Sequence, residues 1–121
     1  MDYTAIIAQM DEQRARWHDL PDMPGKRLRL LRPLETDVDK LGGTSLHRLA
    51  DALAEFVTDW AGFTEADLVG ASQGSDAVIP FDRRLFARWM RDRLEVTTFV
   101  GEQVHAAIQA HRAEREQARK N

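Results

Sequence analysis

The stretch Ser45–Trp60, SLHRLADALAEFVTDW, decides the fold class that the sequence predicts. Its apolar residues recur in steps of three and four, which on an α-helix places them on one stripe. They are Leu46, Leu49, Leu53, Phe56, Val57 and Trp60. Thr44 or Ser45 can cap the first turn, and Gly62 can end the helix in the left-handed conformation. We therefore expect an amphipathic helix that packs its stripe into a core.

Three further segments have helical spacing. The first, 2–17, has an apolar stripe that Arg14 interrupts, and the last runs from Glu95 to about His111. Between them, Asp82 is a good cap for a helix over 83–93, and Phe81 can pack on its first turn as a hydrophobic staple. Two shorter turns of helix are expected, one over 35–41 and one after the capping residue Thr64.

The segment between the first two helices has a different pattern. Two prolines and a glycine in LPDMPG, 20–25, indicate a loop or hinge. The following KRLRLLRPL alternates charge and leucine, which favours a short strand with one wet face. Because Pro33 cannot donate a hydrogen bond to a ladder, an edge strand or an extended segment near 27–32 is expected.

These segments together predict a mainly α fold, a small helical bundle of four to five helices with at most one short edge strand. The expected organisation is an N-terminal helical arm over 1–20, a helical core domain over 26–111 and a charged C-terminal helical extension over 112–121. An arm of about four turns is marginal alone in water, so it should dock on this domain or on a partner.

Composition narrows the functional classes. A chain of 121 residues is one domain's worth, and its net charge of −3 argues against a protein that coats nucleic acid. The chain has no cysteine, which removes disulfides and thiolate chemistry and fits a reducing cytosol. No apolar run approaches the length of a membrane span, and acids stand near the N-terminus where a signal peptide has basic residues.

No catalytic, cofactor or metal site is expected. The four histidines offer no pair at the i, i+4 spacing of a helical metal site. The serines lack the strand–turn–helix frame of a nucleophile, and the glycines at 70 and 74 are not followed by the lysine of a phosphate loop. The sequence therefore indicates a non-enzyme that needs no cofactor.

A resemblance to a known family begins at Glu55. The order EFVTDWAGF, a polar glycine-bearing loop and VIPFDRRLFARWM resembles the tail assembly chaperones of long-tailed bacteriophages. The earlier segment LRLLRPLETDVDKL looks like the proline-containing lead-in and short helix of those proteins. The likeness covers roughly residues 28–108 and leaves the N-terminal arm and the charged end unplaced.

The resemblance implies a non-catalytic function in the cytoplasm of the host bacterium. Such chaperones bind the tape-measure protein, shield its apolar helices and leave before the virion is complete. The major tail protein is a second candidate partner, and a homo-oligomer is open. The candidate partner-binding residues are aromatic, and stripe aromatics also fit the domain's own interior. They are Trp60, Phe63, Phe81 and Trp89.

Two other functional classes stay open. The arginines near 26–32 and the row Arg84, Arg88 and Arg91 allow a small nucleic-acid-binding regulator, although acids share the same helices. A structural subunit of the phage tail or connector is the other alternative. Neither a membrane partner nor, given the net charge, a nucleic acid is favoured.

Overall fold

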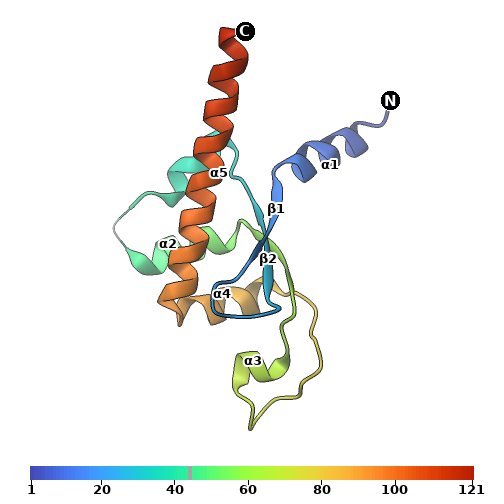
Figure 1. Ribbon diagram of the computed structural model, residues 1–121, viewed down its shortest axis with the longest axis vertical. Coiled ribbons are helices and arrows are strands. Elements are labelled where there is room, and N and C mark those ends of the chain that lie inside the picture. Colours follow the sequence, from blue (N-terminus) through green and yellow to red (C-terminus); the bar gives the residue numbers. More distant parts are fainter. Residues whose placement is uncertain (44) are drawn as a thin grey trace.

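The computed structural model describes residues 1–43 and 45–121, so the alternative cap Thr44 lies outside the described residues. Its helices and strands alternate along the chain (Figure 1). In order they are α1 (Tyr3–Gln13), β1 (Ala15–Asp19), β2 (Arg27–Leu31), the 3-10 helix η1 (Glu35–Leu41), α2 (Leu46–Ala54), β3 (Val57–Ala61), α3 (Glu65–Val69), α4 (Arg83–Arg91) and α5 (Leu94–Lys120).

The three strands form one antiparallel sheet in the order β1-β2-β3. The expected mainly α bundle is therefore wrong, because the fold is mixed, with helices packed on a sheet. Figure 1 shows α2, α4 and α5 gathered beside the strands, and one core cluster joins buried residues of these helices to Leu28 and Leu30 of β2. This core packs the sheet against the long helix α5, which lies beside the strands in Figure 1.

The predicted helix over 45–60 ends early, and its last residues form β3. Val57 and Trp60 are both buried although they lie three residues apart. The register explains this spacing: Leu30 pairs with Val57 and Arg29 with Asp59, which leaves Thr58 as an extra, bulged residue. A bulge lets two strand residues three apart face the same core, so this strand has the spacing of a helix.

The predicted first helix is also too long, since α1 ends at Gln13 and Trp17 lies in β1. The segment 20–25 is the turn of a hairpin, closed by the Leu20 amide, which donates to the Lys26 carbonyl at 2.9 Å. The strand near 27–32 exists, but β2 is the central strand rather than an edge. Pro33 permits this position because it follows the last paired residue, Leu31.

Several local predictions are confirmed. Ser45 caps α2, Asp82 caps α4, and Thr64 caps α3 in a reciprocal capping box with Asp67. Phe81 packs near Phe86 of the α4 first turn, with ring centroids 6.3 Å apart, as a hydrophobic staple does. The last helix α5 runs on through the charged segment to Lys120. Whether arm, core and extension are separate units stays a prediction.

Candidate docking groove

The four predicted contact residues come together in one aromatic cluster. Trp60 of β3 stacks on Phe63 with ring centroids 4.6 Å apart, and Phe63 meets Trp89 of α4 edge-on at 5.2 Å. Phe81 meets Trp60 edge-on at 5.4 Å. The Trp60 indole N–H donates to the Ile79 carbonyl at 2.9 Å, which fixes the ring against the loop before α4.

This cluster lies in the interior of the domain. Phe63 is 0% exposed, Trp60 and Trp89 are 5% exposed each, and Phe81 is half-buried. Their contact with a partner therefore stays a prediction, and a set of exposed apolar side chains lies elsewhere, on α1.

Helix α1 carries an exposed apolar stripe. None of its eleven residues is buried, although the Asp2 carboxylate accepts from the amides of its first turn and caps it. Four apolar side chains at helical spacing are exposed on it. They are Tyr3, Ile6, Ile7 and Met10. Figure 1 shows α1 projecting away from the domain, in keeping with this exposure.

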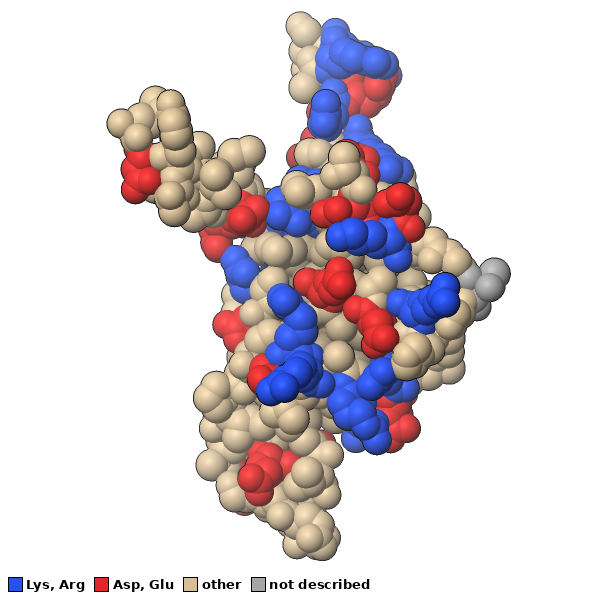
Figure 2. Space-filling model, turned by 180° about the vertical axis from the view of Figure 1, so that it is seen from behind, with Lys and Arg blue, Asp and Glu red and all other residues tan. Residues whose placement is uncertain are grey.

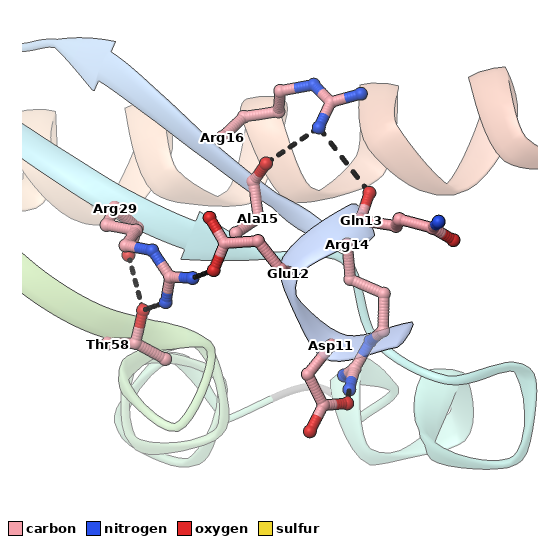
Figure 3. Close-up of polar contacts among 8 residues, drawn as sticks. All are labelled: Asp11, Glu12, Gln13, Arg14, Ala15, Arg16, Arg29 and Thr58. Atoms are coloured by element: carbon pink, nitrogen blue, oxygen red, sulfur yellow. Dashed lines mark hydrogen bonds and ion pairs between the residues drawn. The ribbon is translucent and has the colours of Figure 1, made fainter. Parts of the chain in front are cut away.

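Polar contacts at the base of α1 set its direction (Figure 3). Arg29 of β2 donates to the Glu12 carboxylate at 2.6 Å and to the Thr58 hydroxyl at 2.8 Å. Arg14, which follows α1, pairs with Asp11 at 2.8 Å and donates from Nε to the Arg32 carbonyl at 2.8 Å. These contacts join the end of α1 to the sheet.

A groove of about 860 Å³ lies between α1, the first two strands and α5. Ile7 and Met10 line it from α1, and Leu30 and Leu31 line it from β2. The α5 wall is made of Val104, Ala106, Ala107 and Ala110, together with the polar residues Gln103, His111 and Glu114. Alanines allow close approach of another backbone, so this wall suits a helix laid along it.

The far end of the α5 wall is braced by an ion pair. The Arg112 guanidinium donates from Nε and from its terminal nitrogen to the Glu35 carboxylate at 3.1 Å and 3.0 Å. The hydrogen bond from Arg112 lowers the pKa of Glu35, and the same bond raises the pKa of Arg112. This two-point contact ties α5 to η1 beside the groove.

Cations are gathered on the sheet side of the groove. Arg14, Arg16 and Arg32 line it together with His18. Burial first, and then the neighbouring Arg14 charge, lowers the pKa of Arg32, while burial and then Arg16 lower the pKa of His18. The Arg16 guanidinium donates only to backbone carbonyls, those of Ala15 and Gln13, among the described contacts. Arg14 pairs with Asp11, and Glu114 lines the groove too, so charges of both signs face a ligand here.

The groove mixes apolar, cationic and acidic side chains. Its lining lacks a nucleophile held next to a positioned base, and no group of three or more potential metal ligands occurs among residues 1–43 and 45–121. In that same part of the chain, no helix has the length and apolar character to cross a membrane. The apolar part of this lining has the character of surfaces that bind amphipathic helices.

The sequence pointed to α1 as an arm but missed the groove beside it. Two signals were present: the stripe 3, 6, 7 and 10 and the alanines at 106, 107 and 110. The groove itself depends on the hairpin of β1 and β2. The helical spacing of residues 2–17 predicted a helix where β1 begins.

No protein-family model, no curated protein and no solved structure matches the chain.

Proposed function

We propose that this protein is a non-catalytic tail assembly chaperone that holds a helix of the tape-measure protein in the groove between α1 and α5. The observation that carries the proposal is the exposed apolar stripe of α1 beside an apolar, alanine-walled groove. Helix-in-groove recognition uses such surfaces, with apolar anchors at i, i+3, i+4 and i+7. The site of action would be the cytoplasm of the host bacterium.

The family resemblance of residues 28–108 supports the same class of function. Tape-measure proteins are long and helical, so they present repeated apolar stripes that need cover before the tail tube forms. The groove offers the apolar and small residues of the α5 wall, and Arg16 and Arg32 line its sheet side. We expect the bound segment to be an amphipathic helix with acids flanking its stripe.

Capture of the tape-measure protein from a lysate that contains it tests this function. Ala110→Glu puts a charge on the groove wall at an exposed helix position, where it does not disturb the core. Gln109→Glu makes the same change of charge at a neighbouring exposed residue outside the groove lining. The wild type and Gln109→Glu should retain the tape-measure protein, and Ala110→Glu should lose it.

Two outcomes would contradict the proposal. One is failure of the folded wild type to retain the tape-measure protein, and the other is equal capture by both glutamate variants. A chaperone should also be absent from purified virions, whereas a structural tail or connector subunit would remain in them.

A further inference from the structure

We infer that the Thr58 hydroxyl sets the width of the groove, because it holds Arg29 in the contact with Glu12 that fixes the direction of α1. Thr58 lies outside the groove lining, so it acts through Arg29 as a positioning residue. The effect on the direction of α1 follows from the contacts described below. The effect on capture of the tape-measure protein rests on the function proposed above.

The direction of α1 depends on the end of the helix that meets the sheet. Residues 3–10 are all exposed, and Figure 2 shows the helix as an arm that stands clear of the rest of that face. Arg14 is the single residue between Gln13, which ends the helix, and Ala15, which begins β1. A change in the backbone angles of such a terminal residue turns the whole helix, so contacts of the last turn have to hold it.

Arg29 makes that contact from the outer face of the sheet. Its neighbours Leu28 and Leu30 are buried in the core, and side chains alternate along a strand, so Arg29 faces the other way. Its guanidinium donates to the Glu12 carboxylate at 2.6 Å. The Glu12 side chain is 74% exposed and that of Arg29 is 22% exposed, so Arg29 is the held partner of the pair. An exposed ion pair is weak unless one partner is already held in place, because ordering two long side chains costs entropy.

Thr58 supplies the hold on Arg29. It is the bulged residue of β3, and a bulge re-aims a side chain relative to the ladder. The Thr58 hydroxyl accepts from the Arg29 guanidinium at 2.8 Å and donates to the Arg29 carbonyl at 3.4 Å (Figure 3). Asp59 lies across the ladder from Arg29, but its carboxylate accepts from the Trp60 amide at 2.8 Å. Loss of the hydroxyl therefore leaves Asp59 as a second acceptor that competes with Glu12.

The direction of α1 decides the spacing of the groove walls. Ile7 and Met10 line the groove from α1, and Ala107 and Ala110 line it from α5. Packed helices have axes about 8–10 Å apart, so a bound helix needs walls at a defined separation. An α1 that changes direction would present the same lining residues at a variable separation. The Thr58 hydroxyl should thus affect binding although it touches no client.

Distances between two nitroxide labels, measured by pulsed electron paramagnetic resonance, test this inference. The chain has no cysteine, and Ala8→Cys with Gln109→Cys places one label on α1 and one on α5, both at exposed positions outside the groove lining. The labelled wild type should have a single narrow distance distribution. Thr58→Val keeps the shape of the side chain without its hydroxyl and should lose that narrow distribution. Thr58→Ser keeps a hydroxyl and should retain it, as should Arg27→Gln, which removes the neighbouring ion pair with Asp19.

The urea unfolding midpoint separates positioning from a general loss of stability. The midpoints of Thr58→Val and Thr58→Ser should agree, although their label distances differ. A Thr58→Val distribution as narrow as that of the wild type overturns the inference, and so does equal broadening in Thr58→Ser or Arg27→Gln. Retention of the tape-measure protein should fall for Thr58→Val and not for Thr58→Ser. A wild type that retains no tape-measure protein contradicts the proposed function and leaves the positioning of α1 standing.

Discussion

Replacing Phe63 by alanine separates a core role of the aromatic cluster from a docking role. Phe63 is 0% exposed and makes ring contacts with Trp60 at 4.6 Å and Trp89 at 5.2 Å. Truncating a buried phenylalanine costs about 3–5 kcal/mol. Each lost aromatic pair contributes about 0.5–1.5 kcal/mol beyond buried area, so the expected loss lies in the upper part of that range.

Such a loss is large for a domain whose total stability is roughly 5–15 kcal/mol. Urea unfolding followed by tryptophan fluorescence should give a much lower midpoint with an unchanged slope. Val78→Ala is the control, because Val78 is 69% exposed and its truncation should change the free energy of unfolding by less than about 0.5 kcal/mol.

The result that would refute this reasoning is a Phe63→Ala loss below about 1 kcal/mol, well under the usual cost of such a cavity. If that variant kept its stability and lost the tape-measure protein, the ring would be a docking residue. The sequence-based assignment of Phe63 to a partner surface would then hold.

Three further predictions concern the base of α1, the capping-box residue Asp67 and nucleic acid. Glu12→Gln should change the free energy of unfolding by less than about 1 kcal/mol, because the Glu12 side chain is 74% exposed, but should speed amide exchange in α1. Burial alone raises the pKa of Asp67, yet hydrogen bonds from Thr64 and the Lys26 contact hold that pKa below its ordinary value. The stabilisation by Asp67 is therefore full at neutral pH and is lost as the pH falls below about 4. Asp67→Asn should lower the free energy of unfolding by about 0.5–2 kcal/mol at pH 7, and the two proteins should have the same stability in acid. Duplex DNA should not bind even at low salt, as measured by fluorescence anisotropy, because acids accompany the arginines on the helices; binding that falls steeply with salt would support the regulator instead.

Helix caps and turns could be predicted from the sequence because they depend on neighbouring residues. Asp82 and Thr64 act where their side chains reach amides three residues on, and such signals are local. The sheet could not be predicted in the same way. In β3 the bulge at Thr58 gives Val57 and Trp60 a spacing that helices share, so periodicity alone selected the wrong element.

The groove could not be predicted from the sequence for a related reason. It joins residues near both ends of the chain, such as Met10 and Ala110, through a hairpin whose pairing is set by tertiary contacts. Aromatic residues drew attention in the sequence because they are large, but size favours burial as much as binding. The sequence predicts the arm that carries the stripe of α1. The surface beside that arm could be recognised only from the folded structure.

The most direct test of the account is site-specific photo-crosslinking from the groove wall. The chain has no cysteine, so Ala110→Cys and Gln109→Cys each accept one benzophenone label on α5, inside and outside the groove lining. In a complex that co-purifies with the tape-measure protein, the label at 110 should crosslink to it and the label at 109 should not. Crosslinks from 109 alone, or equal crosslinks from both positions, would contradict a client held between α1 and α5.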